Sequence, residues 1–205
     1  MFFQLAGLNP LLILPWLVAI ILAISLHEFS HALAGYLQGD DTAQAAGRLT
    51  LNPFAHLDWI GLLLLVLVGF GWGKPTPYNP YNLKFPKWGS ALVGLAGPVS
   101  NLLMALISLT IFKLLGFHSL NWTSATSLLQ VFLLMMIELN IMLCIFNLIP
   151  IPPLDGSKFL PRETMLKLEM YGPWLLLALI LFGGGILSRV INVVLLFLYQ
   201  IFGLI

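Results

Sequence analysis

Charged residues are scarce in this sequence of 205 residues, where lysine, arginine, aspartate and glutamate together make up 8%. Soluble globular domains carry about 25% charged residues, and a chain of this size cannot bury a 60% hydrophobic composition in one core. This shortage of charge excludes a soluble enzyme, a disordered chain and a fibrous protein. The formal net charge of +1 provides no basic surface, so we expect no nucleic-acid partner.

Cysteine is almost absent as well. The single cysteine, Cys144, lies in an apolar stretch, and this excludes a disulfide framework within the chain. The N-terminal residues lack the basic region of a cleavable signal peptide. We therefore expect the first hydrophobic run to be retained as a helix.

Long apolar runs dominate what is present, and about 20 such residues span a bilayer. Runs of sufficient length occupy residues 11–37, 91–115 and 127–149. The C-terminal run, residues 171–205, is interrupted by three glycines and is predicted to form one or two spans. These runs predict one all-α polytopic membrane domain over residues 1–205, with a core at 11–156, C-terminal helices at 171–205 and about five to six transmembrane helices.

The chain between the first two full spans is expected to contain short re-entrant or β-strand segments. Residues 60–71 are apolar but too few to cross a bilayer comfortably. Residues 47–53 alternate in polarity, as in a short strand followed by a turn. Residues 73–87 contain four prolines and are predicted to be extended.

Two histidines and a glutamate interrupt the first apolar run in the pattern His27-Glu28-Phe29-Ser30-His31. Residues four apart share one face of a helix, so both imidazoles can bind one divalent ion. Glu28 can reach a water molecule at that ion without being a ligand. Polar groups of this kind are costly within a membrane span and are functional by default. The alternative is a polar cluster that holds packed helices together.

A third metal ligand is expected, because catalytic zinc usually takes three protein ligands and keeps one position open. Glu138 lies in the middle of the third span and is one candidate. Asp155 follows that span, after three prolines that break the helix. An irregular turn that ends in Asp-Gly can aim a carboxylate inward, which favours Asp155.

These motifs together resemble those of the site-2 proteases, a family of intramembrane zinc metalloproteases. The stretches His27–His31 and Asn147–Gly156 match the family patterns H-E-x-x-H and N-x-x-P-x-P-x-x-D-G, and Gly97–Asn101 resembles its central-helix motif. The stretches Gly47–Pro53 and Gly73–Pro75 resemble the compact prokaryotic branch, which carries no PDZ or CBS module. The resemblance covers residues 11–156.

The resemblance implies a zinc metalloendopeptidase with one zinc ion per chain, held by His27, His31 and Asp155, and with Glu28 as the general base. It implies regulated intramembrane proteolysis, in which peptide bonds are hydrolysed within or near transmembrane segments. The expected substrate is a single-span membrane protein in the lipid bilayer, which another protease has in some cases already cleaved.

Three further residues are candidates for substrate binding. Asn147 would help to hold the substrate or the developing oxyanion. His56 is a second candidate, although a histidine in a loop is more often structural. Asn101 is a third, although an asparagine within a span more often bonds a neighbouring helix.

The shared metal also constrains the topology. If His31 and Asp155 bind one ion, the first and third spans must run in the same direction, with one crossing between them, so residues 60–71 must turn back. Seven of the nine basic residues fall in connectors on the metal side, namely Arg48, Lys74, Lys84, Lys87, Lys158, Arg162 and Lys167. The positive-inside rule then predicts an active site toward the cytoplasmic face, and the resemblance to the prokaryotic branch implies an inner (plasma) membrane of a prokaryotic cell.

Two alternatives from other classes remain open. A membrane metal-ion transporter also uses intramembrane histidines and acids, but it would predict ligands on several helices and inverted repeats. A catalytically inactive scaffold would keep the fold and hold a partner helix. The sequence leaves the substrate and the oligomeric state unassigned.

Overall fold

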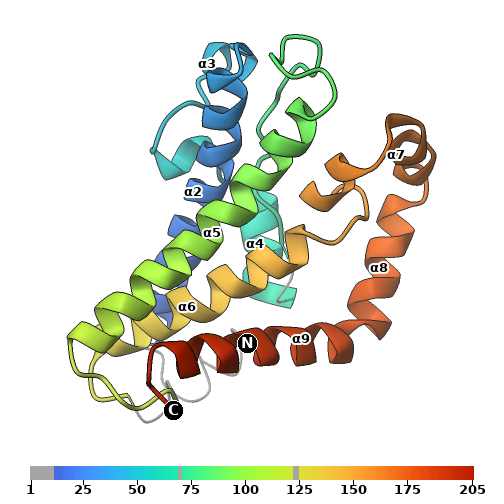
Figure 1. Ribbon diagram of the computed structural model, residues 1–205. Helices are drawn as coiled ribbons and strands as arrows, with labels where there is room; N and C mark the ends of the chain where they lie inside the picture. Colours follow the sequence, from blue (N-terminus) through green and yellow to red (C-terminus); the bar gives the residue numbers. More distant parts are fainter. Residues whose placement is uncertain (1–11, 69–70, 122–124) are drawn as a thin grey trace.

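The computed structural model describes residues 12–68, 71–121 and 125–205 (Figure 1). Its elements are α2 (Ile13–Leu37), α3 (Thr42–Ala45), η2 (Pro53–Ala55), α4 (Trp59–Val68), α5 (Gly89–Leu114), α6 (Leu128–Asn147), η4 (Asp155–Phe159), α7 (Arg162–Glu169), α8 (Gly172–Phe182) and α9 (Gly184–Ile201). Within the described ranges every regular element is a helix, and one isolated antiparallel bridge joins Leu57 to Gly73. The predicted all-α fold class is confirmed.

Helices α2, α5 and α6 form the body of the molecule (Figure 1). Helices α2 and α6 run from the lower end of the view to the upper end, and α5 runs in the opposite direction beside them. Buried apolar side chains fill the contacts in two clusters. One cluster includes Trp16 and Met135 between α2 and α6, and the other includes Phe112, Ile137 and Leu198 between α5, α6 and α9. The packing brings the C-terminal ends of α2 and α6 to the same end of the bundle, as the topology argument predicts.

The limits of α6 follow from its sequence. The hydroxyl of Ser127 accepts a hydrogen bond from the backbone N–H of Gln130 at 3.2 Å, which caps the first turn. Three prolines follow the helix at residues 150–153, and proline cannot continue a helix interior. The chain therefore turns after Asn147 and folds back as the short helix η4, which begins at Asp155.

Four of the described helices are long and apolar enough to cross a membrane, namely α2, α5, α6 and α9. A fifth span results if α7 and α8, which are bent by 73° at their junction, are taken as one broken span. The chain is therefore a membrane protein with four or five candidate spans. Helix α4 has ten residues and is too short to cross, in agreement with its expected turn back.

The connector at residues 47–53 differs from its expected conformation. It forms no strand, because its backbone bonds locally: the N–H of Arg48 donates to the carbonyl of Ala43, and residues 53–55 form η2. The side chain of Arg48 is buried instead of projecting from a sheet face. An alternating pattern needs a neighbouring strand to pair with, and the bridge found among the described residues joins Leu57 to Gly73, outside this connector.

The C-terminal residues form two helices separated at Gly183. Helix α8 has 11 residues and α9 has 18, so α9 is the one that meets the length of a span by itself. Figure 1 shows α9 lying across the lower end of the bundle, where Leu195, Leu198 and Tyr199 are buried. Helix α8 exposes most of its apolar side chains, as a lipid-facing helix does.

Candidate metal centre

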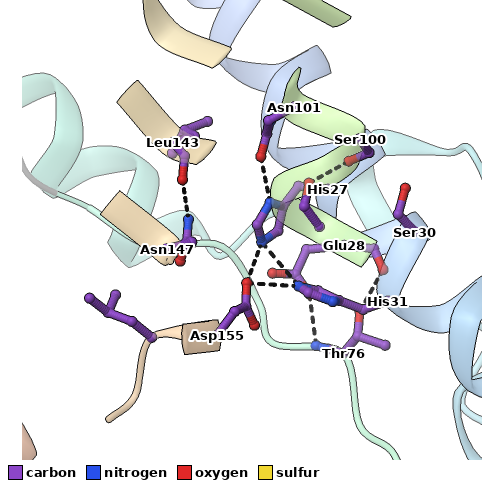
Figure 2. A network of polar contacts seen from close by, with 12 residues as sticks. His27, Glu28, Ser30, His31, Thr76, Ser100, Asn101, Leu143, Asn147 and Asp155 are labelled. Carbon is purple, nitrogen blue, oxygen red and sulfur yellow. Dashed lines mark hydrogen bonds and ion pairs between the residues drawn. The ribbon is translucent and has the colours of Figure 1, made fainter. Parts of the chain in front are cut away.

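Three side chains meet where α2, α5 and η4 come together (Figure 2). His27 and His31 lie one turn apart on α2, with their Nε2 atoms 3.0 Å from each other. The Oδ2 atom of Asp155 lies 3.0 Å from Nε2 of His27 and 3.1 Å from Nε2 of His31. All three residues are buried. Among the described residues, this is the group that could hold a metal, and it contains Asp155 and not Glu138.

Each imidazole is oriented by a hydrogen bond from its outer nitrogen. Nδ1 of His27 donates to Oδ1 of Asn101 at 2.6 Å, and Nδ1 of His31 donates to the backbone carbonyl of Val93 at 2.6 Å. These partners are oxygen acceptors, so the protons lie on the Nδ1 atoms and the Nε2 lone pairs face Asp155. Such partners fix the tautomer and orientation of metal-binding histidines.

The donor set fits a zinc ion. Two imidazole nitrogens and a carboxylate oxygen converge within 3.1 Å, an arrangement of electron-pair donors that suits a shared metal cation. Two histidines and one carboxylate are a ligand set of catalytic zinc sites. Ligand atoms about 2.0–2.1 Å from a tetrahedral zinc ion lie about 3.3 Å apart, close to the observed separations.

A polar network behind His27 joins the three long helices. The amide nitrogen of Asn101 donates to Oδ1 of Asn140 at 2.8 Å, and Asn140 donates to the carbonyl of Met136 at 2.8 Å. Both asparagines are fully buried. The structure therefore places Asn101, a candidate for substrate binding, against His27 and Asn140 inside the helix packing.

Glu28 contacts a segment that follows α4. Its Oε2 accepts a hydrogen bond from the backbone N–H of Thr76 at 2.8 Å, and its carbonyl accepts one from the Thr76 hydroxyl at 3.0 Å. We call residues 73–78 the covering segment, because they lie across this part of α2 (Figure 2). The covering segment thus fixes one oxygen of the Glu28 carboxylate.

Arg48 anchors the covering segment from its other side. Its buried guanidinium donates to the carbonyl oxygens of Ala55, Lys74 and Pro75. Burial lowers the pKa of Arg48, and the negative charge of Glu28 partly offsets this shift. An arginine retains its charge under such a shift, because its ordinary pKa is above 12.

His56 also helps to hold the covering segment. It is fully buried, and its Nε2 donates to the carbonyl of Thr50 at 2.8 Å. Its own carbonyl accepts the backbone N–H of Lys74 at 2.8 Å. The structure therefore places this candidate substrate-binding residue among backbone contacts of the connector.

Asp40 fixes the chain just beyond the covering segment. Its carboxylate accepts hydrogen bonds from the Thr42 hydroxyl, the backbone N–H of Asn79 and the amide of Asn82. Burial raises the pKa of Asp40, but these hydrogen bonds favour the charged form more strongly and hold the pKa below its ordinary value. The ionised carboxylate ties the end of α2 to the chain that leads into α5.

A cavity of about 420 Å³ opens beside the three candidate ligands. Glu28 and Asn147 contribute to its polar lining, and Asn147 donates its amide to the carbonyl of Leu143 at 3.0 Å. Apolar side chains of α6 and α8, including Phe146 and Leu176, complete the wall. The cavity has room for a short stretch of extended peptide next to the candidate metal centre.

Asp155 also has a charged neighbour, Lys158, whose Nζ lies 2.8 Å from Oδ1. Burial alone would raise the pKa of the Asp155 carboxyl, but the charge of Lys158 favours the ionised form and helps to hold the pKa below its ordinary value. Asp155 is therefore ionised at neutral pH, as a metal ligand must be.

Comparison with known proteins gives a consistent result. Residues 15–167 match the model of peptidase family M50. The protein named "Putative zinc metalloprotease YwhC" of Bacillus subtilis is 41% identical over 172 residues, which cover 80% of this chain and 78% of the relative. Rip2 of Mycolicibacterium smegmatis, which carries the same description, is 30% identical over 155 residues, covering 73% of this chain and 56% of the relative. No solved structure gives a significant match.

Proposed function

This chain belongs to peptidase family M50, and we propose that it is an intramembrane zinc metalloprotease that hydrolyses peptide bonds within or near transmembrane segments of membrane proteins. One observation carries the proposal: Glu28 and the three candidate ligands line the same cavity at one end of the helix bundle. A base beside a metal centre suits hydrolysis, whereas transport of the metal would have no use for it.

His27, His31 and Asp155 would hold one zinc ion, with their Nε2 and Oδ2 atoms as ligands. When bound there, zinc supplies Lewis acidity, which polarises a substrate carbonyl and acidifies water. The ligands themselves are kept ready for this role by Asn101 and by the carbonyl of Val93, which hold the protons on the outer imidazole nitrogens. Little rearrangement is then needed on binding.

Glu28 would act as general base and then as general acid. The N–H of Thr76 holds Oε2, so we assign proton transfer to Oε1. This oxygen takes the proton of the attacking water and passes it to the nitrogen of the leaving amine. Asn147, which lines the cavity, would donate to the peptide carbonyl as negative charge develops on its oxygen.

A substrate helix must unwind before cleavage, because its carbonyls are hydrogen-bonded within the helix. An extended part of the enzyme would hold the unwound peptide by edge pairing. The sequence offers residues 47–51 and 75–83, and because residues 47–51 form local turns instead of a strand, the second stretch is the candidate. The second stretch is supported by its position, since Pro75, Thr76 and Tyr78 line the cavity beside Glu28.

The membrane side follows from charge. Connectors at the end of the bundle that holds the metal centre carry most of the basic residues, and Lys113 lies at the C-terminal end of α5, which points the other way. By the positive-inside rule, the active site faces the cytoplasm of a prokaryotic cell, in its plasma membrane. Regulated intramembrane proteolysis of a single-span protein, in some cases already cut by another protease, fits this position.

The test compares wild-type protein with Glu28→Gln, purified in detergent, on a panel of single-span model substrates. Glu169→Gln is the matched control, because it makes the same chemical change on the exposed surface of α7. We expect Glu28→Gln to lower the cleavage rate by about 10²- to 10⁴-fold and Glu169→Gln to leave it unchanged. All three proteins should retain about one zinc ion per chain, as measured by metal analysis.

Other results of this test would favour a different function. Zinc in every protein with no cleavage of any substrate would favour the inactive scaffold. Zinc uptake into vesicles by the reconstituted wild type, without cleavage, would favour the transporter. Absence of zinc from the wild-type protein would contradict the proposal at its centre.

A further inference from the structure

The two oxygens of Asp155 have different partners. Oδ2 faces the two imidazoles, whereas Oδ1 accepts a hydrogen bond from Nζ of Lys158 at 2.8 Å. Both residues belong to the 3₁₀ helix η4, in which side chains three residues apart lie directly above each other. The local geometry of η4 therefore brings the ammonium to the carboxylate without help from a distant element.

Lys158 is held in this position from two more sides. Its aliphatic stem packs against Gly94 of α5, where an added Cβ would lie 2.9 Å from Cδ of the lysine. Its ammonium lies 5.4 Å from the centre of the Tyr78 ring, within the range of a cation–π contact. Lys158 is half-buried and lines the same cavity as Glu28. It thus bridges η4, α5 and the covering segment.

This arrangement decides how the carboxylate meets a metal. A carboxylate that is free to rotate can bind an ion through one oxygen or through both. The ammonium occupies Oδ1, so Oδ2 alone is presented beside the two Nε2 atoms. Three single-atom ligands leave the fourth position of a tetrahedral zinc ion open, which hydrolysis requires.

We propose that Lys158 is a positioning residue for the metal centre: it holds Oδ1 of Asp155 and so keeps this carboxylate a one-oxygen ligand. The inference rests on the proposed function, because it assumes that the metal binds at His27, His31 and Asp155. An exposed ion pair of this spacing would contribute little. Here the Asp155 carboxylate is buried, and its other oxygen, Oδ2, is the proposed metal ligand.

The experiment measures metal binding to the purified full-length protein rather than activity. Zinc affinity is determined by competition with a chelator of known affinity for wild type, Lys158→Met, Lys158→Arg and Lys87→Met. The last variant is the matched control, because Lys87 is exposed on the connector before α5. We expect Lys158→Met to weaken zinc binding by about 10- to 100-fold and Lys158→Arg to restore most of the affinity. Lys87→Met should bind zinc as the wild type does.

A second measurement reports the coordination itself. The proteins are loaded with cobalt(II), whose visible absorption is intense in four-coordinate sites and weaker in five-coordinate ones. The wild-type, Lys158→Arg and Lys87→Met proteins should give the four-coordinate spectrum, and Lys158→Met the weaker spectrum of a carboxylate bound through both oxygens. A structural role of Lys158 in folding alone would not change the coordination number.

The outcomes separate this inference from the proposed function. Wild-type affinity and an unchanged cobalt spectrum in Lys158→Met would overturn the role of Lys158 and leave the metalloprotease proposal intact. Absence of zinc and cobalt binding by the wild type would overturn both. If Lys158→Met loses its helical circular dichroism, Lys158→Gln is measured instead, and the same two results decide the question.

Discussion

Gly97 lies against the face of α2 that carries His27 and His31, where its lack of a side chain lets α5 approach the two imidazoles. A Cβ at this position would lie 2.5 Å from Nε2 of His31 and 2.6 Å from Nε2 of His27. Both atoms are proposed ligands, and both rings are already fixed from their other side. The position therefore has no room for even a methyl group.

We expect Gly97→Ala to lower cleavage of the model substrates by about 100-fold or more, because the added methyl displaces the ligands. Zinc content should fall with it. Gly184→Ala is the control, since nothing lies within 4 Å of a Cβ at Gly184. Normal zinc content and activity in Gly97→Ala would show that the site does not use the two Nε2 atoms as described.

The proximity of His27, His31 and Asp155 could be predicted from the sequence, and the groups that support them could not. The spacing of the two histidines indicates a shared helix face, and the proline-rich turn favours Asp155, while the roles of these residues stay predictions. The partner of His31 is the carbonyl of Val93. Every residue has a backbone carbonyl, so the sequence does not show which one accepts this hydrogen bond. Asn101 does have a side chain, but its contact with His27 depends on how α5 packs on α2.

At the scale of elements, the covering segment links Arg48 to Glu28, the proposed general base. Arg48 holds the carbonyls of Lys74 and Pro75, and the next N–H, that of Thr76, holds Oε2 of Glu28. The covering segment holds Glu28 through a backbone N–H. A proline substitution tests this contact, because proline has no backbone N–H.

We expect Thr76→Pro to lower kcat by about 10- to 100-fold, the loss of one hydrogen bond to a charged group, with KM and zinc content little changed. Thr76→Val is the matched variant, since it removes the hydroxyl and keeps the N–H. It should retain most of the activity. Equal kcat values for the two variants would contradict a positioning role for this N–H.

The connectors are also where sequence and structure diverge most. Apolar length predicts α2, α5 and α6 to within a few residues, because a bilayer imposes it. Residues 47–53 show the alternation of a strand, yet their polar groups bond within local turns and to the ring of His56, while the side chain of Arg48 reaches out to Lys74 and Pro75. Such a segment is shaped by contacts with distant parts of the chain, which periodicity does not report.

For the whole molecule, the direction of the bundle in the membrane can be measured. Lys87 and Lys113 are exposed near opposite ends of α5. In a Cys144→Ser background, we expect a membrane-impermeant maleimide to label Lys87→Cys from the cytoplasmic side and Lys113→Cys from the opposite side. Labelling is measured in intact cells, which expose the outer face to the reagent, and in inverted vesicles, which expose the cytoplasmic face. The reverse labelling pattern would place the metal centre on the outer face.

The number of spans was the least predictable property at this scale. The C-terminal residues are apolar throughout, so composition alone does not say whether they cross once or twice. The structure divides them at Gly183, into a short helix α8 and a longer helix α9. The division falls at the glycines of residues 183–185, and α9 then packs against α6 through residues some 60 positions apart.

The separation of the ligands along the chain has a consequence for biosynthesis. Asp155 lies 124 residues after His31, beyond both α5 and α6. A ribosome releases the N-terminal helices first, so a nascent chain carries the two histidines long before Asp155 emerges. Under the proposed function, a chain that is still being inserted lacks its third metal ligand and would not cut the newly inserted helices beside it. Cleavage would become possible only after α6 and η4 have been made.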